Sequence, residues 1–220
     1  MNTQIDTLSA RVAAIGFYRC HFKRVVDLTL TIVALPAILT VSMIIVLLIK
    51  LDSHGPALIR VRRLGRSHTL FYKYKFRTMV VDAEQVLQNL LATHPEVRLE
   101  YEATYKIRND PRITRFGRLL RKTSLDELAQ VVNVIRGEMS WVGPRDILPS
   151  ELAMYREHGE KLLSVRPGIT GLWQVSGRSK LPYSERVRLD SHYIDHLSLF
   201  EDSKILFKTI AVVLFGSGAA

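Results

Sequence analysis

The chain has 220 residues and a formal net charge of +10, from 31 Lys and Arg against 21 Asp and Glu. This length is enough for one ordinary domain plus an appendage, and the positive surplus favours anionic partners such as lipid headgroups, nucleotides or phosphates. The lone Cys20 excludes an intramolecular disulfide, and no Cys/His cluster has the spacing of a metal site.

The first predicted element is a long apolar helix. From Leu28 to Ile49 the chain carries no charged residue, and a straight helix of that length measures about 33 Å, enough to cross the hydrocarbon of a bilayer. The apolar stretch is too long for a cleavable signal peptide. Length alone therefore predicts a single membrane-spanning helix.

Two features favour a different path for this segment. Cations flank both ends, and the positive-inside rule favours the cytoplasmic side for both flanks. Pro36 lies near the middle, where it removes a backbone hydrogen bond and kinks or breaks a helix. We therefore predict a re-entrant hairpin bent at Pro36, with Thr31 and Thr40 covering freed carbonyl groups, and keep the spanning helix as the alternative. The flanking cations are Arg19, Lys23 and Arg24 before the segment and Lys50, Arg60, Arg62 and Arg63 after it.

The chain after the anchor has the composition of a globular domain. Residues 56–61 and 69–76 predict two strands, joined by a turn at Gly65. Residues 82–93 predict an amphipathic helix that ends at Pro95.

Two helices are predicted in the middle of the chain. Residues 113–122 predict a basic amphipathic helix, which is typical either of a solvated face or of a helix that lies on anionic lipid. A second helix is predicted over residues 125–136, ended by Gly137. The side chains predicted to face inward from it are Leu128, Val131, Val132 and Ile135.

The rest of the chain is predicted to be loops and a final helix. Residues 139–146 and 165–179 are dense in Gly, Pro and Arg, and their glycines would let the backbone approach a ligand closely. Residues 198–215 have an apolar face interrupted by charges, which predicts a helix that packs on the core or lies in the membrane interface.

The candidate site is the acid pair Asp126 and Glu127. Ser124 followed by Glu127 matches a capping box, and Asp126 would then lie in the first helical turn, so a purely structural interpretation explains both acids. Positive charge and a helix N-terminus also stabilise an ionised carboxylate. Such a carboxylate near a phosphate can coordinate Mg²⁺ or attack phosphorus. The cations that precede the pair are Arg108, Arg112, Arg115, Arg118, Arg121 and Lys122.

Five motifs in order carry a resemblance to a known family. They are "KRVVD", "IKLDSHGPALIR", "YKYKFRTM", "TSLDELAQVVNVIRGEMSWVGPRD" and "VRPGITGLWQVSGRS", and they cover most of residues 23–180. With them the chain resembles the bacterial sugar transferases, the monotopic polyprenyl-phosphate hexose-1-phosphate transferases, in their short form and near the exopolysaccharide-initiating enzymes.

The resemblance implies a fold and a location. The expected fold is an α-rich α+β protein with an N-terminal re-entrant membrane helix hairpin, one small cytoplasmic catalytic domain and amphipathic interfacial helices. The expected divisions are a cytoplasmic segment over 1–22, a membrane anchor over 23–51 and the catalytic domain over 52–220. The expected location is the cytoplasmic face of the inner membrane.

The resemblance also implies an activity. Galactose- or glucose-1-phosphate would pass from a UDP-sugar to undecaprenyl phosphate through an aspartyl phospho-sugar, in the first membrane step of exopolysaccharide synthesis. Asp126 would be the nucleophile and Glu127 the ligand of Mg²⁺. The expected partners are both substrates and the bilayer, with no nucleic acid, while homo-oligomerisation stays open. The residues expected to hold phosphate groups are Lys75, Arg77, Arg121, Arg145 and Arg178.

Four positions depart from the family pattern. Leu35 stands where Ser usually precedes the anchor proline, Ala129 replaces the proline of "DELPQ", and Val61 stands where Gln is common. Asp146 replaces a proline after "VGPR" and puts a negative charge beside Arg145, which weakens the phosphate assignment of Arg145.

Two other functions are compatible with the composition. The chain could be a non-catalytic, membrane-tethered basic module that binds anionic lipid or a partner protein, with the acids acting only as a cap. A nucleic-acid binder is disfavoured, because the cations gather near an apolar anchor and no nucleic-acid-binding motif is found.

Overall fold

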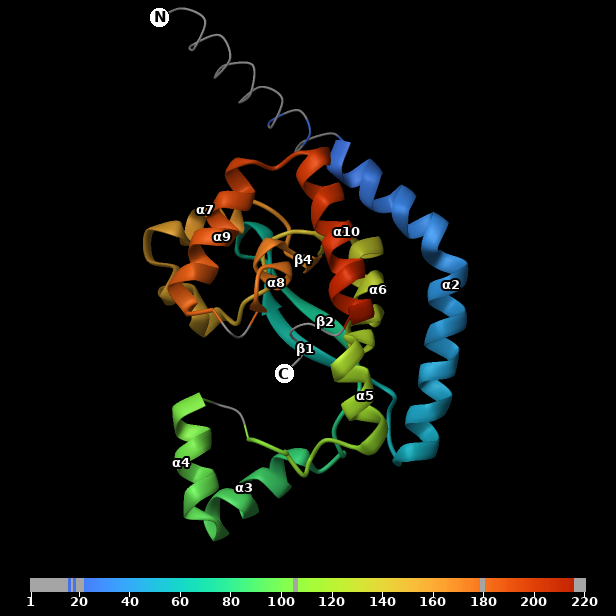
Figure 1. Cartoon of the computed structure of the whole chain (residues 1–220), viewed down its shortest axis with the longest axis vertical. Helices are drawn as coiled ribbons and strands as arrows, with labels where there is room; N and C mark the ends of the chain where they lie inside the picture. Colours follow the sequence, from blue (N-terminus) through green and yellow to red (C-terminus); the bar gives the residue numbers. More distant parts are fainter. Residues whose placement is uncertain (1–15, 17, 19–21, 105–106, 179–180, 216–220) are drawn as a thin grey trace, which may run out of the picture.

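The computed structural model describes residues 16, 18, 22–104, 107–178 and 181–215, so most of the predicted segment 1–22 lies outside the described residues. Helices surround two small two-stranded sheets (Figure 1), which confirms the α-rich α+β class. The α-helices are α2 (Lys23–Asp52), α3 (Ala83–Thr93), α4 (Pro95–Thr104), α5 (Arg115–Thr123), α6 (Val131–Arg136), α7 (Gly159–Leu163), α8 (Leu172–Val175), α9 (Tyr183–Asp195) and α10 (Leu199–Phe215). The 3₁₀ helices are η2 (Arg66–His68), η3 (Leu125–Gln130) and η4 (Pro149–His158), and the strands are β1 (Leu58–Leu64), β2 (Leu70–Phe76), β3 (Ser140–Val142) and β4 (Gly168–Thr170).

The apolar segment forms one continuous helix, α2, with Pro36 inside it. Figure 1 shows this helix bowed along one side of the molecule. Proline removes the bond to the carbonyl four residues back, at Ile32, but the Thr40 hydroxyl donates to the Pro36 carbonyl and the Thr31 hydroxyl to the Asp27 carbonyl. The prediction that these threonines cover the freed carbonyl is therefore wrong. The re-entrant path through a bilayer is not confirmed and stays a prediction.

One narrow stripe of α2 packs on the rest of the protein. Its buried residues recur at helical spacing, as expected of a helix with one partnered face. Only 17% of its most apolar window is buried, so α2 is not the core helix of a soluble fold but a helix long and apolar enough to cross or enter a membrane. The buried residues are Lys23, Asp27, Thr31, Ile38, Ile45 and Ile49.

Both ends of α2 are bonded to the same folded unit. At the start, the Lys23 ammonium lies 2.6 Å from the Asp202 carboxylate of α10. At the end, the Asp52 carboxylate accepts a hydrogen bond of 3.1 Å from the Phe116 backbone N–H of α5. The two ends of a helix about 45 Å long are thus held by one body.

The predicted strands form the antiparallel hairpin β1–β2, with Leu58 opposite Phe76 and Leu64 opposite Leu70, and Gly65 at the turn. The prediction of this hairpin is confirmed. Its inner face is unusual, because Lys73 is buried between the strand neighbours Phe71 and Lys75 while Tyr72 points to solvent.

The helix predicted over residues 125–136 begins as the 3₁₀ helix η3 and continues as α6. A 3₁₀ helix advances about 20° more per residue than an α-helix, so six residues shift the helical face by about 120°. The inward placement of Val132 and Ile135 is therefore wrong: they are 38% and 48% exposed, whereas Asn133 and Val134 are fully buried.

The Gly-rich loops bring backbone against backbone. β3 and β4 pair in parallel, and a Cβ on Gly168 would lie 2.1 Å from the Gly143 backbone nitrogen. The expectation that these glycines let the backbone approach a ligand is corrected at Gly143 and Gly168, because there they let two backbone segments approach each other.

The remaining helices were partly foreseen. α3 confirms the predicted amphipathic helix, but Pro95 both ends it and starts α4, which was not predicted; proline suits a first helical position. α10 confirms the C-terminal helix, with Ile205 buried against the core and Phe207 exposed.

Gly117→Ala is expected to destabilise the fold by about 1–3 kcal/mol, as overpacking does. A Cβ at Gly117 would lie 2.1 Å from the Thr78 backbone oxygen, so α5 would have to move. Denaturant unfolding checks this. In Gly159→Ala the nearest atom to the new Cβ belongs to the flexible Leu152 side chain, at 3.2 Å, and the nearest backbone oxygen lies at 3.9 Å. A loss in that control as large as in Gly117→Ala would contradict the explanation.

Candidate active site

The acid pair lies on η3. One residue of η3 belongs to an apolar cluster that also includes the end of α2. Asp126 is buried and Glu127 is partly exposed. Beneath them, Ala129 of η3 packs with Phe76 of β2 and Leu120 of α5. Ile45 and Ile49 of α2 complete this cluster, so α2 packs against η3, which carries the acid pair.

Lys75 of β2 contacts both acids. Its ammonium lies 2.7 Å from Asp126 Oδ2 and 3.4 Å from Glu127 Oε1. Burial alone would lower the pKa of Lys75, but Glu127 and Asp126 together raise it above the ordinary lysine value. Lys75 is therefore charged at neutral pH and lies between the two carboxylates.

The capping box predicted from Ser124 and Glu127 is wrong, although Asp126 does lie in the first turn of η3. Ser124 is in the left-handed region, with φ +57°, and its hydroxyl makes no cap to η3. Instead the Ser124 Oγ accepts a hydrogen bond of 3.3 Å from Arg178 Nη1. Arg178 is itself left-handed, with φ +52°. Such backbone strain gathers at functional sites, and here it places Arg178 beside the segment that carries the acids.

Arg121 is the second cation beside the acids. Its Nε donates to the Thr78 hydroxyl at 2.9 Å, which directs the guanidinium from α5 toward the end of β2. Burial lowers the pKa of Arg121, and the nearby negative charge of Asp126 opposes that shift. The guanidinium therefore lies within electrostatic reach of Asp126.

Arg145 lies in the loop that follows β3. Its guanidinium stacks over the Trp173 ring at 5.3 Å. The carboxylate of the neighbouring Asp146 is bound at 2.6 Å by both Lys73 and Arg63, and the positive charge of Arg145 also lowers the pKa of Asp146. The negative charge of Asp146 therefore still acts on Arg145, and the contact of Arg145 with phosphate stays a prediction.

Arg77 has a structural role. Its terminal nitrogens donate to the backbone carbonyls of Ser53 and His54, at 2.9 and 2.5 Å, just after α2 ends. Of the predicted cations, Lys75 therefore contacts both acids, Arg121 bonds Thr78 near Asp126, and Arg178 bonds Ser124 two residues before Asp126. Arg77 instead bonds the chain just after the end of α2.

The donor chemistry of the acid pair suits Mg²⁺. This ion prefers oxygen and is commonly held by one or two carboxylates together with substrate phosphates. Asp126 and Glu127 supply such oxygens, and the Lys75 ammonium already marks a cation position between them. Because the described part of the chain has no group of three acidic, His or Cys side chains placed for a metal, substrate oxygens would have to complete the ligands.

Contacts of three side chains around the site were not predicted from the sequence. Lys73 could have been found, since the alternation of a strand puts it on the same face as Lys75. Thr78 and Ser124 could not, because their partners Arg121 and Arg178 reach them only through tertiary packing.

Lys75→Met is expected to lower catalytic efficiency about a hundredfold, because it removes a preorganised positive charge from a buried carboxylate pair. The kcat/KM for release of the nucleotide product measures this. Lys161→Met is the matched control, since that lysine pairs with the exposed Asp195. An unchanged Lys75→Met enzyme would contradict the role assigned to Lys75.

Fold and site together define a class of protein in which a carboxylate pair, surrounded by cations, is fixed beside the end of a long apolar helix. The protein-family model described as "Bacterial sugar transferase" matches residues 18–216, so the chain belongs to the bacterial sugar transferase family. The resemblance drawn from the five motifs is confirmed.

Individual relatives agree with this family. The chain is 51% identical over 165 residues to the undecaprenyl-phosphate galactose phosphotransferase of Salmonella typhimurium, covering 75% of this chain and 35% of the relative. It is 45% identical to an uncharacterized sugar transferase of Haemophilus influenzae, covering 100% and 44%. It is 42% identical to the exopolysaccharide production protein ExoY of Sinorhizobium fredii, covering 90% and 87%. The chain thus spans less than half the length of the first two relatives and most of the third.

Proposed function

We propose that this protein transfers galactose- or glucose-1-phosphate from a UDP-sugar to undecaprenyl phosphate, the first membrane step of exopolysaccharide synthesis. The contact of one lysine with two adjacent carboxylates, fixed to the end of an apolar helix, carries the proposal. The names of the Salmonella and Sinorhizobium relatives support the substrate class and the pathway.

The reaction proceeds in two displacements at phosphorus. An oxygen of Asp126 attacks the phosphorus that carries the sugar, forming an Asp126–phosphate bond as the bond to UMP breaks. A phosphate oxygen of undecaprenyl phosphate then attacks the same phosphorus and frees the Asp126 carboxylate. The covalent step lets UMP leave before the second anion binds, so the two anionic substrates need not share the pocket.

The cations of the site lower the barrier to both displacements. Lys75, Arg121 and Arg178 neutralise the charge that develops on the phosphate oxygens in the transition states. When bound by Glu127 and substrate oxygens, Mg²⁺ would supply further positive charge. Arg145 would bind an outer phosphate.

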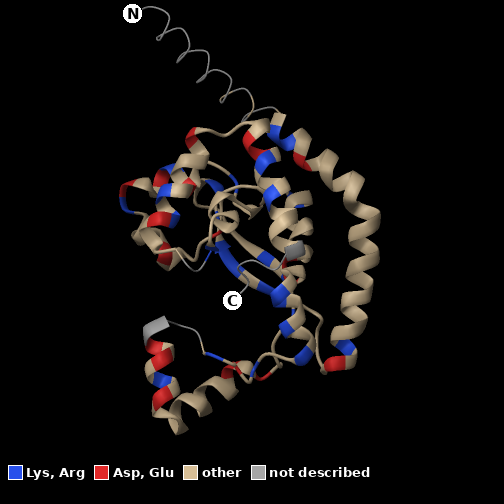
Figure 2. Cartoon of the chain, viewed as in Figure 1, with Lys and Arg blue, Asp and Glu red and all other residues tan. Residues whose placement is uncertain are grey.

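We further propose that α2 is re-entrant and that the site lies at the cytoplasmic face of the inner membrane. Bonds from one folded body to both ends of α2 support this proposal, because they favour the same side of a bilayer for both ends. Figure 2 supports this arrangement, since α2 carries charge only at its ends while Lys and Arg gather along β1–β2 and α5. On α5, the exposed cations Arg115, Arg118 and Lys122 suit contact with anionic headgroups.

A panel of UDP-sugars tests the substrate proposal. With undecaprenyl phosphate present, UMP release and label in an organic-extractable lipid are expected with UDP-galactose or UDP-glucose. Absence of lipid-linked label with every sugar would overturn it. Topology has a separate test: tags before residue 23 and after residue 55 should both be reachable only from the cytoplasmic side.

A further inference from the structure

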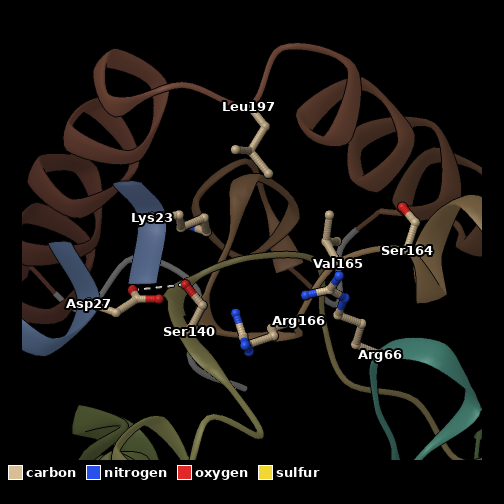
Figure 3. Close-up of a pocket in the computed structure, with 8 residues that line it drawn as sticks. All are labelled: Lys23, Asp27, Arg66, Ser140, Ser164, Val165, Arg166 and Leu197. Carbon is tan, nitrogen blue, oxygen red and sulfur yellow. Dashed lines mark hydrogen bonds between the residues drawn. The ribbon is translucent and has the colours of Figure 1, made fainter. Parts of the chain in front are cut away.

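A second polar pocket lies at the start of α2, away from the acid pair. Figure 3 shows its lining, which comes from the first turns of α2, the tip of the β1–β2 hairpin, β3, and the segments after α7 and α9. Lys75 is on β2 at the other end of the hairpin. About 17 Å of strand separates it from Leu70 beside the tip, so the pocket is distinct from the candidate active site. The lining residues are Lys23, Asp27, Arg66, Ser140, Ser164, Val165, Arg166 and Leu197.

Two arginines in this pocket have free hydrogen-bonding capacity. Arg166 donates through Nε to the Gly137 carbonyl at 2.7 Å, but its terminal nitrogens bond to nothing in the described part of the chain. The exposed Arg66 guanidinium makes no hydrogen bond or ion pair with the described residues. Burial lowers the pKa of Arg166, and the positive charges of Arg66 and Arg24 lower it further. The cluster therefore holds positive charge that the fold does not neutralise.

The other charged groups of the pocket do not relieve this surplus. The Lys23 ammonium is already paired with Asp202. The Arg24 guanidinium donates hydrogen bonds to backbone carbonyls near the end of α6. Asp27 is the remaining acid, and its Oδ1 accepts from the Ser140 hydroxyl at 2.9 Å and from the Trp141 backbone N–H at 3.1 Å.

Asp27 also leaves one oxygen without a partner. Its Oδ2 is buried and accepts no hydrogen bond from the described residues, and Asp27 as a whole is only 2% exposed. A buried acceptor without a donor is costly, so such an atom indicates an absent partner. Toward the described residues, the pocket thus has arginine donors and a carboxyl oxygen without partners, and its ligand should carry both a phosphate-like anion and an N–H or O–H donor.

We propose that this pocket binds the headgroup of a membrane phospholipid, with the phosphate held by Arg66 and Arg166 and a hydroxyl or amine of the headgroup held by Asp27 Oδ2. Arginine suits phosphate because its fork of donors binds oxygen pairs. The position at the first turn of an apolar helix favours a lipid over a soluble phosphate. The inference rests on the proposed membrane insertion of α2 and does not depend on the transfer chemistry.

Lipid retention tests the inference. The full chain carrying Asp126→Asn, which keeps substrate turnover out of the measurement, is placed in nanodiscs of equal parts phosphatidylethanolamine, phosphatidylglycerol and phosphatidylcholine. Native mass spectrometry then identifies the lipids that stay bound. We expect phosphatidylethanolamine or phosphatidylglycerol to be retained over phosphatidylcholine, whose headgroup has a phosphate but no N–H or O–H donor.

Arg66→Ser should reduce this retention about tenfold, since one charge-assisted hydrogen bond is lost. The fold should stay intact, because the Arg66 side chain bonds none of the described residues. Arg62→Ser is the matched control, since Arg62 is an exposed arginine of the same hairpin whose side chain bonds none of the described residues. Asp27→Asn should abolish the discrimination against phosphatidylcholine. Equal retention in Arg66→Ser and Arg62→Ser overturns the inference.

A soluble arm separates the two sources of phosphate. Inorganic phosphate is titrated into the detergent-solubilised Asp126→Asn chain by calorimetry. Binding that disappears in Arg66→Ser, without any enrichment of phospholipid, would overturn the lipid assignment. Neither arm measures sugar transfer, so failure here is distinguishable from failure of the proposed function.

Discussion

Asp126→Asn is expected to lower sugar-phosphate transfer by roughly four orders of magnitude or more, because an amide cannot take the place of a carboxylate nucleophile. The substitution keeps the size of the side chain and an oxygen that can accept from Lys75. The fold should therefore survive while the chemistry stops. Transfer of label from the UDP-sugar into lipid measures the loss.

Two further measurements define that result. Asp82→Asn is the matched control, because Asp82 is exposed and makes no side-chain cap at the start of α3. Incubation of the unmodified protein with donor alone should add the mass of a hexose phosphate to the peptide that contains Asp126. An active Asp126→Asn variant would rule out covalent catalysis and return the non-catalytic basic module to consideration.

Asp146→Ala is expected to destabilise the protein by about 3–5 kcal/mol, the usual result of leaving a buried charge without its partner. The Lys73 side chain is only 3% exposed and relies on Asp146 at 2.6 Å. Asp195→Ala provides a control with the same 2.6 Å distance, but its pair with Lys161 is 55% and 32% exposed, so the loss should stay within about 1 kcal/mol. Similar losses from both variants would show that burial of the Asp146 pair is not decisive.

The Asp146 carboxylate should also make the free energy of unfolding depend on pH in the acidic range. Burial alone would raise the pKa of Asp146, but Lys73, Arg145 and Arg63 hold it well below the ordinary aspartate value. The ionised group therefore contributes its full stability above the unfolded-state value of about 3.9 and loses it as the pH falls further. Unfolding free energies measured between pH 6 and pH 3 should fall more steeply for the unmodified protein than for Asp146→Asn.

The elements that could be predicted were those with strong local signals. The charge-free run predicted α2, and Gly65 between two strand-like runs predicted the hairpin. The boundaries of the helix after Ser124 were close, yet its buried face was not, because periodicity assumes one helix type and η3 is a 3₁₀ helix. The periodicity of apolar residues indicates a helix but does not indicate where a 3₁₀ helix changes into an α-helix.

Some residues of the candidate site could likewise be predicted from local sequence, and others could not. Asp126 and Glu127 were visible as a pair, and the resemblance pointed to Lys75, Arg121 and Arg178 as their neighbours. The structural role of Arg77 could not be predicted, because its carbonyl partners belong to a segment more than twenty residues earlier in the chain. The prediction of a capping box was wrong for a similar reason. Arg178, which donates a hydrogen bond to the Ser124 hydroxyl, lies 54 residues later in the chain.

The ion pair between Lys23 and Asp202 has a consequence for biosynthesis, because the two residues are 179 positions apart in the chain. The ribosome releases Lys23 and the rest of the α2 stripe long before α10 exists. Until α10 has been synthesised, the nascent chain must keep this ammonium hydrated, so the start of α2 can pack against its partner only after Asp202 has left the ribosome.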